Sequence, residues 1–329
     1  MLDKNLLTPV TGDDAKALFK AHVSNVEIET FSYCNRVCSY CPNAVHDRRS
    51  FKSFMSDRHL DMLIRDLAAI DYRNQIVLSH YNEPMADVRI IEHIARFRRA
   101  APNALIALYS NGDFLDRDMF DALVAAGLTH LTISIHLAAN EPWDDRKVIN
   151  RLMEMSRKLN IPADLYHFHP GQAVHAKFRT DALKWFYMLE NDFSRVGVDR
   201  GGILTHLPNL RPRLTPCFYP FNTFNVSYGG NISPCCQIRG DIPSFKNDII
   251  GNLDGFETIF DAYGSDRAAG WRRHLYANSK KEGPCATCGA GTLDLDDATL
   301  ARREQDLAAL LALDPGDAPP AMEDTGISA

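Results

Sequence analysis

Residues 25–42 read NVEIETFSYCNRVCSYCP, and this stretch decides how the rest of the chain is interpreted. The segment Asn25–Phe31, rich in apolar and β-branched residues, predicts a strand. Cys34, Cys38 and Cys41 follow with the spacing Cys-x3-Cys-x2-Cys. Three thiolates this close together can hold an iron–sulfur cubane and leave its fourth iron open to a substrate or cofactor. A zinc knuckle is the alternative, although zinc sites usually add a second cysteine pair or histidines.

Strand-like and helix-like stretches alternate through the first two-thirds of the chain and indicate six βα-like units. Such alternation predicts an α/β fold with a parallel sheet and covering helices. Periodicity alone leaves open whether the sheet closes toward a barrel or stays an open doubly wound sheet. The predicted strands are Asn25–Phe31, Gln75–His80, Leu105–Tyr109, His130–Ile135, Asp164–His169 and Arg195–Val198, and the predicted helices lie near Asp57–Ile70, Val88–Arg99, Asp116–Ala126, Trp143–Lys158 and Thr180–Leu189.

Polar turns follow three of the later predicted strands, at the edge where a parallel sheet gathers its functional groups. The first of them contains Glu83, a carboxylate of the kind that pairs with an ammonium. Ser134 and His136 alternate in phase and so share one face of their strand. Each turn alone is also compatible with an ordinary loop or a packed histidine. The candidate binding residues from these turns are Asn82, Glu83, Ser110, Asn111, Ser134 and His136.

The cysteine spacing, the aromatic Tyr40 before the third cysteine and the order of these turns resemble the radical SAM superfamily. The resemblance implies a partial (β/α)6 barrel with a [4Fe–4S] cluster on Cys34, Cys38 and Cys41. S-adenosylmethionine (SAM) is then bound through the open iron and cleaved to a 5′-deoxyadenosyl radical, with Tyr40 near the adenine.

The resemblance also assigns the polar turns to SAM. Tyr81-Asn82-Glu83-Pro84 is similar to the Gly-Glu-Pro motif that holds the SAM amino group, with Asn82 in place of the glycine. Ser110 and Asn111 are expected to reach the ribose or carboxylate. Ser134 and His136 are expected to contact SAM or the substrate.

The pattern changes at Asn209–Pro216, a connector rich in proline and arginine, and a small second module is expected beyond it. The module is expected to contain strands near Thr223–Tyr228, a turn at Gly229-Gly230 and a helix near Gly264–Tyr276. A helix over Leu295–Leu313 and a disordered tail after it are also predicted. The predicted division is an N-terminal extension (1–24), a core (25–208), an auxiliary module (209–291) and a C-terminal helix and tail (292–329).

The module's cysteines resemble the twitch domain, an abridged SPASM arrangement, with Cys, Gly-x4-Cys and a late Cys-x2-Cys. This implies one auxiliary [4Fe–4S] cluster on Cys217, Cys235, Cys285 and Cys288. Cys236 is spare or replaces Cys235. If it is free, it could donate a hydrogen atom to a substrate radical, and a buried cysteine without chemistry is the alternative. A four-cysteine zinc site is the rival for the cluster itself.

The resemblance to twitch enzymes implies oxidation of a small polar substrate, a sugar or aminocyclitol-like alcohol, with the auxiliary cluster accepting an electron. Arg200 is a candidate substrate contact, and its alternative role is a surface charge or a salt bridge. A flavodoxin- or ferredoxin-like electron donor is implied. Epimerisation or crosslinking of a ribosomally made peptide is the second hypothesis, and a non-catalytic zinc or iron–sulfur scaffold is the third. The 24 residues before the first strand are too few for an independent leader-binding domain.

Composition fits these hypotheses. The 329 residues carry a net charge of −6, which does not favour a nucleic-acid partner. Apolar runs are short, and the N-terminus shows no secretory pattern, so a cytoplasmic protein without a membrane segment is expected. In that reducing compartment, the eight cysteines are expected to be ligands or catalytic groups rather than disulfides.

Overall fold

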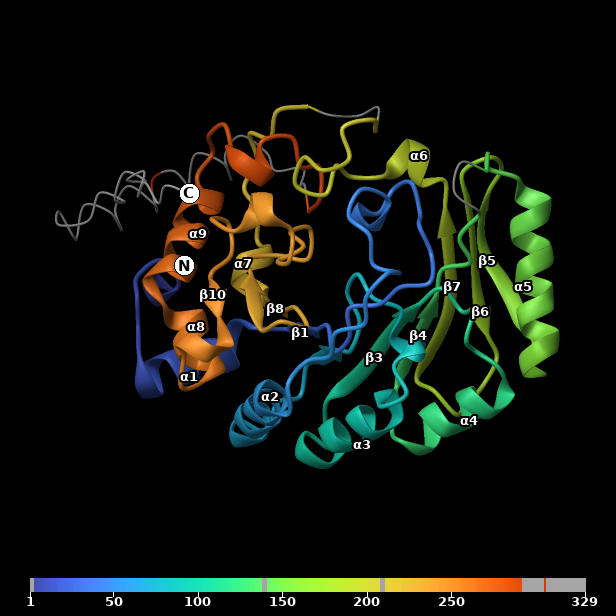
Figure 1. Cartoon of the computed structure of the whole chain (residues 1–329), viewed down its shortest axis with the longest axis horizontal. Helices are drawn as coiled ribbons and strands as arrows, with labels where there is room; N and C mark the ends of the chain where they lie inside the picture. The colour runs from blue at the N-terminus through green and yellow to red at the C-terminus, as the bar shows by residue number, and fades with distance from the viewer. Residues whose placement is uncertain (1–2, 138–140, 208–210, 292–304, 306–329) are drawn as a thin grey trace.

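The fold is built on one long mixed sheet (Figure 1). The computed structural model describes residues 3–137, 141–207, 211–291 and 305. Within these residues ten strands follow the order β10-β9-β8-β1-β2-β3-β4-β7-β6-β5, and the sheet is open because its edges, β10 and β5, do not pair. The strands are β1 (Asn25–Ile28), β2 (Gln75–Val77), β3 (Leu105–Ser110), β4 (His130–Ile133), β5 (Ala163–His169), β6 (Ala173–Phe178), β7 (Trp185–Asn191), β8 (Thr223–Val226), β9 (Asn231–Ser233) and β10 (Gly251–Asn252).

Six neighbouring strands, β8, β1, β2, β3, β4 and β7, run parallel. Val26, Ile28 and Ile76 on these strands are fully buried. Because parallel strands end at the same edge, the loops after β1, β2, β3 and β4 meet there. The α/β class and the parallel core predicted from the sequence are therefore confirmed.

Helices α2 to α5 follow one side of the curved sheet, and the loop after β1 lies on the other side (Figure 1). Side-chain caps fix where two of these helices begin: Ser56 accepts from the His59 N–H, and Asp116 from the Met119 N–H. The helices are α1 (Gly12–His22), α2 (Asp57–Ala69), α3 (Ile90–Ala100), α4 (Arg117–Ala125), α5 (Asp145–Leu159), α6 (Phe193–Val196), α7 (Tyr219–Asn222), α8 (Ile259–Gly264) and α9 (Asp266–Tyr276).

Two predicted elements after β5 are wrong. The predicted helix Thr180–Leu189 is replaced by strand β7, and the predicted strand Arg195–Val198 by the short helix α6. Along β7, buried and half-buried residues alternate strictly, and its aromatic residues suit a strand. The hairpin of β5 and β6 also adds two antiparallel strands. The regular βα alternation therefore stops after α5.

The N-terminal extension packs against the C-terminal part of the chain. Helix α1 contacts α8, and the Phe19 ring lies 5.3 Å from Phe260 and 5.4 Å from Tyr263, centroid to centroid. Strands β8 to β10 of the predicted auxiliary module join the main sheet, since β8 pairs with β1. The predicted helix 295–313 and tail 314–329 lie outside the described residues, apart from residue 305.

Substituting Phe186 tests the observed strand β7. Its ring is buried. The centroid of this ring lies 4.1 Å from that of the Phe178 ring and 5.5 Å from that of the Phe120 ring. Phe186→Ala is expected to lower the free energy of unfolding by about 3–5 kcal/mol, because it leaves a cavity. Urea denaturation measures this loss. The control is Val88→Ala at a residue that is 93% exposed, with an expected change below about 0.5 kcal/mol. Equal stabilities of the two variants would contradict the packing.

Candidate active site

The first cysteine group, Cys34, Cys38 and Cys41, lies on the loop between β1 and the 3-10 helix η2 (Pro42–Ala44). None of the three forms a disulfide. Burial raises the pKa of Cys34 to about 12 and of Cys38 to about 11, and it also raises the pKa of Cys41. The thiols are thus protonated at neutral pH and release protons when a metal binds.

The chemistry of this donor set fits an iron–sulfur cluster. Among the described residues, no three His, Cys, Asp or Glu side chains converge closely enough for a single metal ion. A cubane offers a separate iron to each thiolate, so three thiols facing one cavity suit it without converging on one point. Three ligands also leave the fourth iron free for SAM.

One cavity brings the first cysteine group together with all of the predicted polar turns. The three cysteines come from the loop after β1, and the other side chains from the ends of β2, β3 and β4. Tyr40 packs at the side of this cavity, with its ring 5.2 Å from that of His136. The predicted residues that line the cavity are Cys34, Cys38, Cys41, Asn82, Glu83, Ser110, Asn111, Ser134 and His136.

Glu83 ties the ends of β2 and β3 together. Its carboxylate accepts hydrogen bonds from the Ser110 hydroxyl at 2.7 Å, the Asn111 N–H at 2.8 Å and the Met85 N–H at 3.1 Å. Burial raises its pKa to about 7 despite these bonds. Glu83 therefore positions the Ser110 turn as well as offering negative charge to the cavity.

The other turn residues differ in how much bonding capacity remains. The Asn82 side-chain oxygen accepts from the His80 N–H at 2.9 Å, whereas its buried amide nitrogen has no partner among the described residues. Ser134 donates to the Leu189 carbonyl at 3.2 Å. His136 Nδ1 lies 3.6 Å from the buried Glu190 carboxylate. Asn82 and His136 thus keep polar atoms that a bound cofactor can use.

Arg36 is a cavity residue that the sequence analysis missed. Its guanidinium forms a two-pronged ion pair with Asp113, with contacts of 2.7 and 2.5 Å, and donates to the His136 carbonyl at 2.6 Å. It therefore links the cysteine loop to the turns after β3 and β4. Its place between Cys34 and Cys38 is the only sequence signal that pointed to it.

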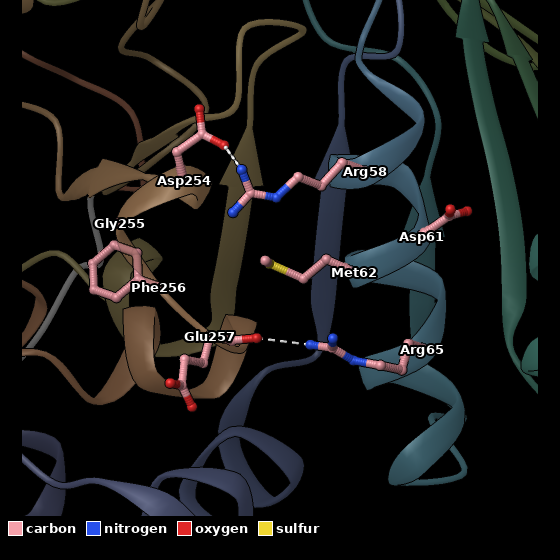
Figure 2. Close-up of a pocket in the computed structure, with 8 residues that line it drawn as sticks. All are labelled: Arg58, Asp61, Met62, Arg65, Asp254, Gly255, Phe256 and Glu257. Atoms are coloured by element: carbon pink, nitrogen blue, oxygen red, sulfur yellow. Dashed lines mark hydrogen bonds and ion pairs between the residues drawn. The ribbon is translucent and has the colours of Figure 1, made fainter.

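A larger groove lies elsewhere, between α2 and the segment around Asp254–Glu257 (Figure 2). Arg58 pairs with Asp254 at 2.9 Å, and Arg65 donates to the Glu257 carbonyl at 2.8 Å. These charged groups already have partners, and no cysteine lines the groove. The smaller cavity at the strand ends is therefore the candidate active site.

The second cysteine group, Cys217, Cys235, Cys285 and Cys288, is buried and free of disulfides. Cys285 interacts electrostatically with Cys217 and Cys288, and Cys235 interacts with Cys217 and Cys285. Burial raises the pKa of Cys285 to about 12 and the pKa of Cys235 well above its usual value. The four thiols thus form one electrostatically coupled set.

Cys236 interacts with Cys235 of this set and also lies near the first cavity. The charged groups that act on its thiol are Glu27 and Arg200, and burial raises its pKa to about 12. Its backbone carbonyl accepts from the Tyr81 hydroxyl at 2.8 Å and lies 2.9 Å from His80 Nε2. Cys236 therefore lies against the residues that line the first cavity.

Arg200 lies near Cys41 of the first cysteine group and near Cys236. It has a left-handed backbone (φ 51°) and donates to the Gln237 side-chain oxygen at 2.9 Å. Its guanidinium is 5.9 Å from the centre of the Tyr81 ring and interacts electrostatically with Cys41 and Cys236. The Nε of the guanidinium is buried, whereas the residue as a whole is half-buried.

Glu27 is a second residue that the sequence analysis missed. It lies on β1, is half-buried, and is placed near His80, Arg200 and Cys236. Burial raises its pKa, while His80 and Arg200 lower it in part. In the sequence, Glu27 is one polar residue in a strand where polar and apolar residues alternate. It belongs to no recognisable motif, so the sequence analysis did not select it.

Comparison with known proteins agrees with this geometry. Residues 28–175 match the family model of the Radical SAM superfamily. This segment is similar to that superfamily and contains the first cysteine group and the predicted polar turns. SAM and a [4Fe–4S] cluster are the cofactors that this match implies, and the first cysteine group lies within the matched residues.

A curated relative of this chain is the S-adenosyl-L-methionine-dependent 2-deoxy-scyllo-inosamine dehydrogenase of Niallia circulans. It is 25% identical over 266 residues, which cover 80% of this chain and 92% of the relative. The crystal structure of BtrN in complex with AdoMet and 2-DOIA superposes with a TM-score of 0.62 at 22% identity. The match covers 84% of this chain and 96% of BtrN. The relative, a dehydrogenase, is an oxidoreductase.

BtrN in an open conformation also matches, with a TM-score of 0.52 at 19% identity, covering 83% of this chain and 98% of that one. These likenesses support the fold described above. No helix in the described part of the chain is both long and apolar enough to cross a membrane.

Replacing Glu83 tests the link between β2 and β3. Glu83→Gln puts an amide nitrogen where a buried oxygen now accepts a hydrogen bond, at a cost of about 1–3 kcal/mol. SAM affinity of the reconstituted protein is expected to fall about tenfold, measured by equilibrium dialysis. Glu92→Gln, on the exposed side of α3, serves as the control and should bind SAM like the parent. An unchanged affinity in Glu83→Gln would show that the turn does not depend on this carboxylate.

Proposed function

We propose that the chain oxidises a small polar alcohol, a sugar or aminocyclitol-like compound, with an auxiliary [4Fe–4S] cluster as electron acceptor. The observation that carries the proposal is the place of Arg200: its guanidinium lies 5.9 Å from the centre of the Tyr81 ring, which lines the first cavity, and donates at 2.9 Å to Gln237, next to Cys236. A substrate held in that space lies between the two cofactors. The named activity of the Niallia circulans relative, a dehydrogenase, supports the same reaction class.

The roles of the cysteines follow from their surroundings. Cys34, Cys38 and Cys41 are proposed to hold the SAM-binding cluster. Four buried thiols, Cys217, Cys235, Cys285 and Cys288, are proposed to hold the auxiliary cluster, since their donor set is entirely sulfur. Cys235 is assigned as the ligand because it faces the other cysteines, whereas Cys236 faces Glu27 and Arg200.

When bound, SAM and its cluster would supply a carbon radical that removes one hydrogen atom from the substrate. The auxiliary cluster would accept the electron that the substrate radical releases as it loses a proton. Asn82, Glu83, Ser110, Asn111, Ser134 and His136 are proposed to surround SAM, with Tyr40 beside its adenine. Arg200 is proposed to hold the substrate hydroxyl. Glu27 is proposed to accept the proton, because its carboxylate has no hydrogen bond among the described residues and burial raises its pKa.

A second candidate function rests on Cys236. Its thiol is directed toward Arg200 and Glu27, where a substrate radical is expected to form. A thiol there can return a hydrogen atom to the radical, so the net reaction becomes epimerisation of a small molecule or a peptide residue. In either case, a flavodoxin- or ferredoxin-like protein is the proposed external electron donor.

Product analysis in D2O separates the two functions. Oxidation of 2-deoxy-scyllo-inosamine or a related amino alcohol is expected to give a ketone lacking two hydrogen atoms, and Cys236→Ser is expected to retain most of the activity. Mass spectrometry of the product is the measurement. A product of unchanged composition that carries one solvent deuterium, and whose formation Cys236→Ser abolishes, would replace oxidation by epimerisation.

The proposed base is tested through Glu27→Gln, which is expected to slow substrate oxidation by about 10²- to 10⁴-fold. SAM binding should persist, because Glu27 does not line the SAM cavity. The base must be ionised to act, and its pKa is raised. The oxidation rate of the parent is therefore expected to be low at pH values below that raised pKa and to increase as the pH rises through it. Glu257→Gln, at an exposed position, is the control. A parental rate and pH profile in Glu27→Gln would exclude the carboxylate as the base.

A further inference from the structure

Two buried cationic side chains flank the second cysteine group. Lys281 is 0% exposed and Arg213 is 4% exposed. Lys281 interacts electrostatically with Cys217 and Cys285, and Arg213 acts on Cys285 and Cys288. At least one of these positive charges therefore interacts with each of three cysteines in the group, namely Cys217, Cys285 and Cys288. Lysine and arginine are seldom fully buried unless a negative group pairs with them.

Arg213 is held only by neutral acceptors. Its guanidinium forms no salt bridge among the described residues, and every acceptor of its side chain is a backbone carbonyl. These hydrogen bonds satisfy its donors but leave its positive charge uncompensated. The carbonyls belong to Thr215, Pro216, Cys288, Ala290 and Gly291.

Lys281 is held in the same way. Its ammonium donates to the His274 carbonyl at 2.9 Å and to the Ala277 carbonyl, at the C-terminal end of α9. The negative end of the helix dipole favours a cation there but does not neutralise it. No carboxylate pairs with this ammonium in the described part of the chain.

Two carboxylates also face the second cysteine group. Asp199 accepts from the Thr287 hydroxyl at 2.5 Å and acts on Cys288, and Asp248 acts on Cys285. Neither forms a salt bridge with Arg213 or Lys281. Burying two uncompensated cations is costly, so an anionic group between them is needed to offset that cost.

We propose that Arg213 and Lys281 are the counter-cations of the auxiliary cluster and raise its reduction potential. Reduction adds one electron to a site that four thiolates already make negative. A buried positive charge stabilises the reduced state more than the oxidised state, because the low dielectric of the interior strengthens the attraction. The two cations thus make the cluster a better electron acceptor. The inference rests on the proposed auxiliary cluster, which the proposed oxidation also requires.

The experiment uses the Cys34→Ala/Cys38→Ala/Cys41→Ala chain, reconstituted with iron and sulfide, so that EPR reports only the auxiliary cluster. A redox titration followed by EPR gives its midpoint potential. Adding Lys281→Met is expected to shift the midpoint to a more negative value. Lys281→Arg, which keeps the charge, is expected to stay close to the background. Lys280→Met, at the exposed neighbouring residue, is the matched control and should leave the midpoint unchanged.

The outcomes separate this inference from the proposed function. An unchanged midpoint in Lys281→Met, with the background's iron content, overturns the inference alone. If Lys281→Met holds no iron, the iron content of Lys281→Arg is decisive. Iron retained by the arginine variant supports a need for positive charge at this position. Loss of iron in both variants shows that the lysine side chain is needed for packing rather than for its charge, and this overturns the inference. A triple-cysteine background without iron refutes the auxiliary cluster itself, and the proposed oxidation loses its acceptor.

Discussion

The structure depends on strand β1 being hydrogen-bonded on both sides. It pairs in parallel with β2 on one side and with β8 on the other, so that Asn25 lies opposite both Gln75 and Thr223. The loop that leaves β1 carries the first cysteine group, and the chain that leaves β8 and β9 carries Cys235. One strand therefore sets the positions of both proposed cofactor sites.

A buried ionic network strengthens the same junction. Arg48 has no exposed surface and contacts Glu29, just beyond β1, at 3.2 Å, and Asp241, after β9, at 2.9 Å. Glu29 also accepts a hydrogen bond from the Tyr81 N–H. Removing one partner of such a pair leaves a buried charge uncompensated. The network thus joins the cysteine loop, the turn after β2 and the C-terminal part of the chain.

The sequence predicted the features that depend on local pattern. Helix α2 was predicted almost to its observed ends, because its apolar period and the Ser56 cap lie within the helix and its flank. Cys34 to Cys41 and the polar turns also meet as predicted, because strand order in a parallel sheet brings their loops to one edge. Features set by distant partners were missed. Strand β7 is defined by its pairing with β4 and β6, and Glu27 becomes notable only beside Arg200, which lies far along the chain.

The continuity of the sheet has a consequence for how electrons can move. The predicted core and auxiliary module share backbone hydrogen bonds between β1 and β8, so the chain has no hinge at that junction. Opening and closing of the two modules therefore cannot serve as a switch there without breaking the sheet. The continuous sheet therefore holds the two proposed cofactor sites at a fixed spacing, whether or not a substrate is bound.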